Sequence, residues 1–127
     1  LASLIDLPRT VLSAGGAPAP GVMAGRDLAR DPEPDAVFAQ ISESQCGRAI
    51  RTRDWTLSVQ AVDADGFAPA SPSATWKVDC LYDNRADPHQ VRNLAVDPAG
   101  AAARRDLLPL LARAMVAGGD REPRFVA

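Results

Sequence analysis

The sequence predicts an α+β fold in which a small four-stranded antiparallel sheet packs against one long C-terminal helix. Four short segments in the middle of the chain alternate apolar and polar residues, as half-buried strands do. The last third carries apolar residues at helical spacing after an Asp-Pro pair. The chain has 127 residues, enough for one modest core. Strands followed by a helix are typical of the α+β class.

The opening segment, Leu4 to Ala14, is predicted to be a short helix. Pro8 fits only near its first turn, and Gly15-Gly16 ends it. Its apolar residues leave no clear polar face, so we expect it to need neighbours on more than one side. The next stretch, up to Asp35, is rich in Gly, Pro, Ala and Asp and is predicted to be a linker or long surface connection.

Four strands are predicted next. Their ranges are Ala36 to Ser42, Arg48 to Arg53, Asp54 to Ala61 and Thr75 to Tyr82. The third has the clearest alternation, with Trp55, Leu57 and Val59 on one face. In the fourth, the same alternation places Trp76, Val78, Cys80 and Tyr82 together, against Lys77, Asp79 and Leu81. Residues 63–74 are expected to form a loop.

Two Asp-Pro pairs predict helix starts, because Asp supplies a capping oxygen and Pro fits the first helical position. Asp87-Pro88 is expected to begin one turn, to about Asn93, and Asp97-Pro98 a long helix to about Ala117. Pro109 should bend or break that helix. Its predicted apolar stripe is Leu107, Leu108, Leu111, Ala114 and Met115, with Arg104, Arg105 and Arg113 outward.

The composition argues against several classes of partner. A formal net charge of −2 predicts no strong attraction to nucleic acid or to an anionic membrane. No apolar stretch approaches the roughly 20 residues that cross a bilayer, so we expect a soluble protein. The arginine bias, with Lys77 as the only lysine, is typical of a GC-rich bacterial genome. The compartment, cytoplasmic or secreted, is left open.

A search for catalytic and metal-binding residues identifies none. Cys46 and Cys80 could pair, but two free, half-buried thiols are favoured. His89 is interpreted as a solvated loop residue, because nothing in the spacing links it to Ser42 or Ser44 as a triad. The run at 63–66, DADG, resembles the start of a calcium loop but lacks the later ligands, so a polar hairpin tip is favoured.

Charged side chains on the predicted strands offer weaker candidates. Arg48, Arg51 and Arg53 could bind an anion such as sulfate, although a solvated face with cross-strand acidic partners is favoured. Acidic residues that could be taken for cation ligands stand at Asp63, Asp65, Asp79, Asp83 and Asp87.

Several blocks of the chain, in order, resemble the C-terminal part of the sulfatase family. SLIDLPRTVLSAGGAP, at 3–18, resembles the family's SLxDLxPTLLxLAGxPxP, and residues 22–28 resemble its continuation, xxGxSL. GRAIRTRDWTLSV, at 47–59, is similar to xRAIRTxRYKYI, and LYDNRADPHQVRNLA, at 81–95, is close to LYDLxxDPxExxNLA. Gln90 stands where the family usually has glutamate. In the third block we expect structural roles: Leu81 and Tyr82 end a strand, Asn93 takes a tight turn, and Leu94 plugs the sheet.

The resemblance implies a piece of an arylsulfatase-like hydrolase of the alkaline phosphatase superfamily. Residues 1–30 would be the end of an α/β catalytic domain, its last short helix plus a linker, and residues 31–127 the C-terminal subdomain. The family's nucleophile is a formylglycine made in a Cys-x-Pro-Ser-Arg segment, which Cys46 does not match. That residue and the family's calcium ligands would precede Leu1. The resemblance therefore implies no catalytic, cofactor-binding or metal-binding residue here, and no cofactor in this chain.

The expected function is to complete the fold of a sulfuric ester hydrolase and to border its active-site cleft. The expected partners are the protein's own N-terminal catalytic domain and a sulfated small-molecule or carbohydrate substrate, with possible self-association through residues 1–14. Two alternatives stay open. The parent enzyme could hydrolyse phosphate or phosphonate esters, or the chain could be a free-standing binding module, which should hide its apolar surface.

Overall fold

The structure is a computed structural model that describes residues 1–42, 46–62 and 73–126. By its internal contacts the chain divides into two compact units, Leu1–Val37 and Phe38–Ala127. Over the described residues, no helix combines the length and the hydropathy needed to cross a membrane.

The first unit contains a single described helix, α1 (Asp6–Ala14). It begins two residues later than predicted and includes Pro8 in its first turn, where proline loses no helical hydrogen bond. Gly15 ends it, and Gly16 follows with a φ of +71°, a conformation that glycine adopts without strain. From there to Asp35 the chain forms turns and irregular structure, as the Gly- and Pro-rich composition predicts.

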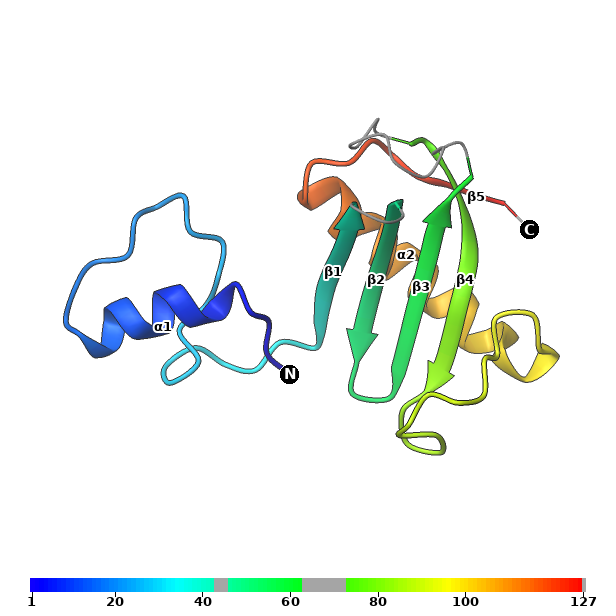
Figure 1. The fold of residues 1–127 in the computed structure, drawn as a ribbon, viewed down its shortest axis with the longest axis horizontal. Helices are drawn as coiled ribbons and strands as arrows, with labels where there is room; N and C mark the ends of the chain where they lie inside the picture. The colour runs from blue at the N-terminus through cyan, green and yellow to red at the C-terminus, as the bar shows by residue number, and fades with distance from the viewer. Residues whose placement is uncertain (43–45, 63–72, 127) are drawn as a thin grey trace. The chain divides into compact units, whose positions relative to one another are not determined.

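The second unit is built on a five-stranded sheet (Figure 1). The strands are β1 (Ala36–Ser42), β2 (Cys46–Thr52), β3 (Trp55–Ala61), β4 (Thr75–Asp83) and β5 (Arg124–Val126), in that order across the sheet. The pairs β2–β3 and β3–β4 are antiparallel, whereas β4–β5 is parallel.

The α+β class and the long helix are therefore confirmed, but the prediction of a four-stranded antiparallel sheet is wrong because the sheet is mixed and has a fifth strand. β5 is only three residues long and follows Pro123, so it is too short to give an alternating pattern.

A β-bulge in β4 changes which side chains reach the core. Ser58 lies opposite Cys80 but Val59 lies opposite Val78, so Asp79 is the extra residue. Trp76 and Leu81, five residues apart, are both fully buried. The prediction that Cys80 and Tyr82 share the face of Trp76 is therefore wrong, since regular alternation does not continue across the bulge. In β3 the predicted core residues Leu57 and Val59 are buried, as expected.

One face of the sheet is covered by the helix α2 (Ala101–Ala117), which contacts β2 and β3 (Figure 1). A 3-10 turn, η1 (Pro98–Gly100), leads into it, and Asp97 caps that turn by accepting the Ala99 N–H at 2.9 Å. The second Asp-Pro signal is thus confirmed. The buried residues of α2 are Ala103, Leu107, Leu111 and Met115.

Two details of α2 differ from expectation. Of the predicted bend or break at Pro109, the break is wrong, because α2 continues through this exposed residue. Arg104, predicted to point outward, instead donates from Nη1 to the carbonyls of Leu94 at 2.8 Å and Asp97 at 3.0 Å. It therefore ties α2 to the segment that precedes it.

The segment between β4 and η1 folds back onto β4 through Asn93. The Asn93 side chain accepts the Leu81 N–H at 3.0 Å and donates to the Asp79 carbonyl at 3.0 Å. Leu94, predicted to plug the sheet, is buried. The single turn expected after Asp87-Pro88 is a hydrogen-bonded turn, not a helical one, in which Gln90 has a φ of +54°.

We expect Asn93→Ala to lower the free energy of unfolding of the second unit by about 1 to 2 kcal/mol, because two backbone groups of β4 lose their partner next to the bulge. Urea unfolding measures the change. Val91→Ala, at a site 85% exposed in the same segment, should stay within about 0.5 kcal/mol of the parent protein. Equal effects of the two substitutions would show that Asn93 does not hold this segment to the sheet.

Candidate functional site

Four polar side chains meet at the end of the sheet where the β2–β3 turn lies. Arg51 and Thr56 are directly opposite in the β2–β3 register. The Thr56 hydroxyl accepts a hydrogen bond from Arg51 Nη1 and another from Gln90 Nε2, each at 2.9 Å, and donates to Asn84 Oδ1 at 2.9 Å. We call Arg51, Thr56, Asn84 and Gln90 the Thr56 cluster. It is the candidate functional site of the second unit.

Gln90 joins the segment after β4 to this cluster, although its own backbone adopts an unfavourable conformation there. A φ of +54° is unusual for a residue with a side chain. The Gln90 amide nitrogen donates to Thr56 and also to Asn84 Oδ1, at 3.1 Å. A glutamate, which the family resemblance would place here, has no such donor when ionised and would face the Asn84 oxygen. The amide therefore serves this hydrogen-bond pattern, and the position carries no acid function.

The three arginines named as anion-binding candidates occupy different environments. Arg48 is buried, 6% exposed, and pairs with Asp120 beyond α2. Arg51 and Arg53 are exposed. Arg51 binds a hydroxyl, and within the described ranges it forms no ion pair with a carboxylate. The prediction of a solvated face with cross-strand acidic partners is therefore wrong for Arg48, which is buried, whereas Arg51 is exposed as predicted but has a threonine as its partner. Arg51 keeps N–H groups available for an oxyanion.

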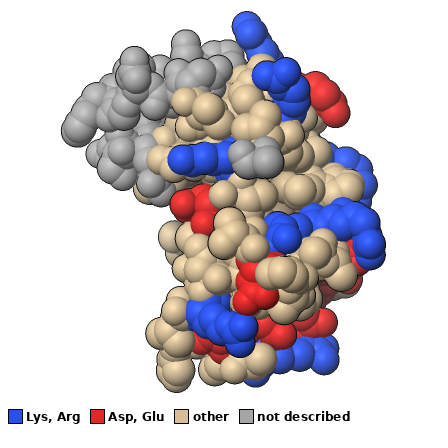
Figure 2. Space-filling model, turned by 90° about the vertical axis from the view of Figure 1, so that its right-hand side faces the viewer, with Lys and Arg blue, Asp and Glu red and all other residues tan. Residues whose placement is uncertain are grey.

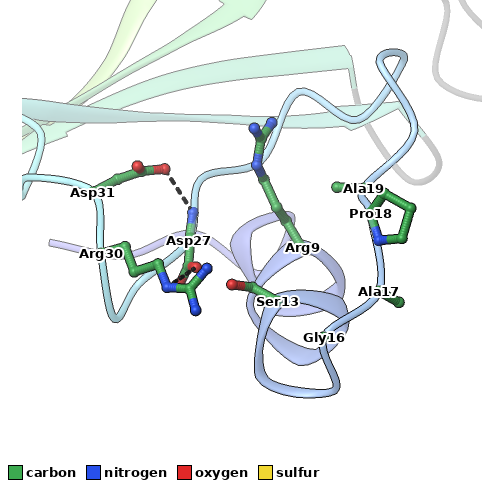
Figure 3. A pocket seen from close by; sticks show the side chains of 9 residues that line it. All are labelled: Arg9, Ser13, Gly16, Ala17, Pro18, Ala19, Asp27, Arg30 and Asp31. Atoms are coloured by element: carbon green, nitrogen blue, oxygen red, sulfur yellow. Dashed lines mark hydrogen bonds and ion pairs between the residues drawn. The ribbon is translucent and has the colours of Figure 1, made fainter.

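A groove of about 520 Å³ lies beside α1 in the first unit (Figure 3). Its charged residues are Arg9, Asp27, Arg30 and Asp31. Asp27 accepts the Ala29 N–H at 2.9 Å and lies 3.7 Å from Arg30 Nε, while Asp31 accepts the Asp27 N–H at 2.8 Å. The two arginines balance the two aspartates in charge, and each carboxylate already accepts a backbone N–H of its own loop. The groove therefore shows no catalytic arrangement.

The pKa of the Asp27 carboxyl is lowered, first by a hydrogen bond from Ser13 and then by the Ala29 N–H. Figure 3 shows the Ser13 hydroxyl turned toward Asp27. Ser13 therefore supports an ionised carboxylate, and no histidine lies among the residues that line this groove.

The first unit is held together by Asp6, which is 3% exposed. Its carboxylate accepts the N–H of Ser3 and of Arg26, each at 2.9 Å, and lies 3.2 Å from Arg26 Nη2. Burial alone would raise the pKa of Asp6, but these hydrogen bonds and the Arg26 charge outweigh it, and the pKa is lowered. Gly25 is needed beside it, because a Cβ there would come 1.9 Å from the Ile5 carbonyl oxygen.

The remaining candidates that the structure describes are not brought together. Cys46 and Cys80 are free and half-buried, as favoured from the sequence. His89 is an exposed loop residue. Asp83 and Asp87 accept backbone N–H groups of the following turns, and Asp79 accepts from Ser58. Among the described residues, no group of three potential metal ligands occurs. The DADG run and Ser44 lie outside the described residues, as does the side chain of Ser42.

The charges on the second unit are also mixed. Figure 2 shows Lys and Arg side chains interspersed with Asp and Glu across the face that it draws. That distribution agrees with a net charge of −2 and differs from the one-signed surface that nucleic-acid binding requires.

We expect the Arg26 amide proton to report the titration of Asp6. Because the folded pKa is lowered, the carboxylate stabilises the first unit at and above its ordinary pKa of 3.8, and this stabilisation is lost as the pH falls through the lower folded pKa. An NMR titration should give a midpoint below 3.8. Asp6→Asn should abolish the transition, and Asp35→Asn should leave it. A midpoint at or above 3.8 would contradict this role.

No protein-family model and no curated protein matches the chain. Solved structures do. BT4656, solved with its substrate D-glucosamine-2-N,6-O-disulfate, matches with a TM-score of 0.69 and 22% identity over 93% of this chain and 24% of its own. A Bacteroides thetaiotaomicron protein assigned to the sulfatases matches with a TM-score of 0.69 and 22% identity over 91% of this chain and 25% of its own. BT1596, a 2-O glycosaminoglycan sulfatase, gives 0.67 and 21% over the same shares.

The chain thus spans about a quarter of the length of these structures. The resemblance to sulfatases predicted from the sequence blocks is confirmed at the level of the fold: this chain has the fold of one segment of a sulfatase.

Proposed function

We propose that the chain is the C-terminal part of a sulfatase-type sulfuric ester hydrolase and is not catalytic by itself. In this proposal the chain completes the fold of the catalytic domain and borders its cleft. The formylglycine nucleophile and the calcium ion would belong to the rest of the protein. The fold likeness, over nearly all of this chain but only a quarter of each sulfatase, supports the assignment.

The observation that carries the proposal is the exposed apolar surface of the first unit. Leu4 is 83% exposed, and Leu7 and Val11 on α1 are 48% and 69% exposed. Their spacing of three and four residues places them along one side of the segment. A self-contained module buries such a stripe, whereas a segment of a larger domain leaves it for its neighbour. The free-standing module is therefore the weaker alternative.

The second unit also offers a face for a neighbouring domain. α2 covers one face of the sheet, and within the described part of this unit no helix covers the other (Figure 1). That other face carries Ala49, Arg51, Thr56, Ser58 and Gln60, most of them half-buried. Small and polar side chains of this kind suit a wet interface within one protein or the wall of a cleft.

In this proposal the Thr56 cluster is the part of the chain that meets a sulfated ligand. Arg51 is held in place by Thr56, which lowers the entropy lost on binding, and its remaining N–H groups can bind a sulfate through paired hydrogen bonds. One structural neighbour is bound to a sugar that carries two sulfate groups. A parent enzyme acting on phosphate or phosphonate esters would present the same subdomain. The reading frame upstream distinguishes the two enzymes.

We expect the isolated chain to bind a hydrophobic dye and to self-associate through the exposed residues Leu4, Leu7 and Val11, which we call the α1 stripe. Sedimentation velocity and dye fluorescence measure the two effects. The double variant Leu4→Glu/Val11→Glu should lower both at least several-fold. Val96→Glu, at a residue 92% exposed outside this unit, should change neither.

A parent chain that is monomeric and binds no dye would contradict the proposal that the α1 stripe awaits a neighbouring domain. Equal effects of the α1 variant and of Val96→Glu would place the association elsewhere on the chain. Circular dichroism of each variant verifies that the fold is kept.

We expect the second unit to bind D-glucosamine-2-N,6-O-disulfate weakly, with a dissociation constant on the order of 1 mM, because only one wall of the cleft is present. NMR shifts of the Arg51 and Gln90 side chains should report the titration. Arg51→Ala should remove it, and Arg113→Ala, at an exposed arginine of α2, should leave it unchanged. Equal loss of binding in both variants, or no binding by the unsubstituted chain, would contradict the proposal that the Thr56 cluster borders the cleft.

A further inference from the structure

The last residues of the second unit form a strap that returns from the end of α2 to the edge of the sheet. We call residues 118–126 the C-terminal strap. Gly119 turns the chain with a φ of +97°, and the Asp120 N–H donates to the Met115 carbonyl at 2.9 Å. The strap then ends in β5, where Arg124, Phe125 and Val126 pair with residues 75–77 of β4.

The strap is tied to the core by a buried ion pair with β2. Arg48 Nε lies 2.7 Å from Asp120 Oδ2, and Arg48 Nη2 lies 2.9 Å from Oδ1, so the carboxylate is held by two parallel hydrogen bonds. The Arg48 side chain is 6% exposed and that of Asp120 is 12% exposed. The guanidinium also stacks over the fully buried ring of Trp76, 5.2 Å from its centroid.

The strap supplies a charged partner for the buried Arg48 guanidinium. An arginine inside a protein is tolerated when a carboxylate and further acceptors surround it, and becomes strongly unfavourable when the carboxylate is removed. Asp120 holds the Arg48 guanidinium through Nε and Nη2, and Nη1 donates to the Ile41 carbonyl at 3.4 Å and the Gly47 carbonyl at 2.9 Å. Asp120 raises the pKa of Arg48 through this hydrogen bond, although burial acts in the opposite direction. Seating of the strap and burial of Arg48 are therefore coupled.

The strap also protects an edge of the sheet. Residues 75–77 of β4 have β3 on one side and β5 on the other. Without β5, the backbone groups along that edge would be free to pair with a strand of another molecule. Three residues of parallel pairing are a short ladder, so a second interaction is needed to keep β5 in place.

We propose that the Arg48–Asp120 pair is a latch that holds the C-terminal strap against β4 and so closes the exposed edge of the sheet. The ion pair, rather than the three-residue β4–β5 ladder, contributes most of the free energy that keeps the strap in place. The latch is independent of the proposed sulfatase function, because it involves only residues of the second unit and no ligand.

Hydrogen exchange on the full chain tests the latch. Asp120→Ala should speed exchange of the hydrogen-bonded amides in β5, residues 124–126, by about tenfold or more, while residues 55–61 of β3 stay protected. Asp106→Asn removes an exposed carboxylate that pairs with Arg105 on α2 at 3.3 Å, and should leave both segments unchanged. Unchanged exchange of the β5 amides in Asp120→Ala would overturn the proposal.

Asp120→Ala could unfold the unit by removing the carboxylate that binds the buried Arg48 charge through two hydrogen bonds, so a second variant is needed. Arg48→Met/Asp120→Ala removes both charges and keeps apolar contact with Trp76, which preserves folding. If its strap exchanges fast while β3 remains protected, the latch is supported. If its strap is as protected as in the parent chain, the β4–β5 ladder alone holds it, and the proposal fails.

Discussion

The return of the chain onto β4 is the interaction on which the second unit depends. Asn93 binds the backbone of β4 at the bulge, and the Leu94 N–H donates to the Leu81 carbonyl at 2.8 Å. Leu94 and Leu81 are both buried, and η1 begins shortly after Leu94, at Pro98. Gly100 is required there, since a Cβ would come 2.6 Å from the Leu94 carbonyl and 2.7 Å from the Leu81 side chain. This junction sets where α2 begins, and therefore how its apolar stripe covers β2 and β3.

Local patterns predicted most of this fold, because each depends on neighbours in the sequence. The alternation in β3, the Asp97-Pro98 cap and the stop at Gly15 are of this kind. The predictions that were wrong concern features that depend on contacts between residues far apart in the sequence. The bulge at Asp79 depends on β3, β5 depends on pairing with β4, and the buried Arg48 pairs with Asp120, 72 residues later.

The candidate site was predicted less well than the fold. Arg51 was named from the sequence, but Thr56, Asn84 and Gln90 join it only through β2–β3 pairing and the turn after β4. A glutamine at a position with positive φ leaves no periodic signal. No local sequence pattern indicated the structural role of Asp6 either. Its partner Arg26 is 20 residues away, and this pair joins the two blocks of the opening segment together with the close approach of Gly25 to Ile5.

The two units share one property: each presents surface that its own residues do not cover. The stripe on α1 and the face of the sheet opposite α2 would both be buried in a protein that supplies the other three quarters of a sulfatase's length. Sequencing the genomic DNA upstream of the codon for Leu1 tests this most directly. The proposal predicts a continuous reading frame long enough for that remainder, containing a Cys- or Ser-x-Pro/Ala-x-Arg segment. A stop codon followed by a start codon just before Leu1 would contradict it.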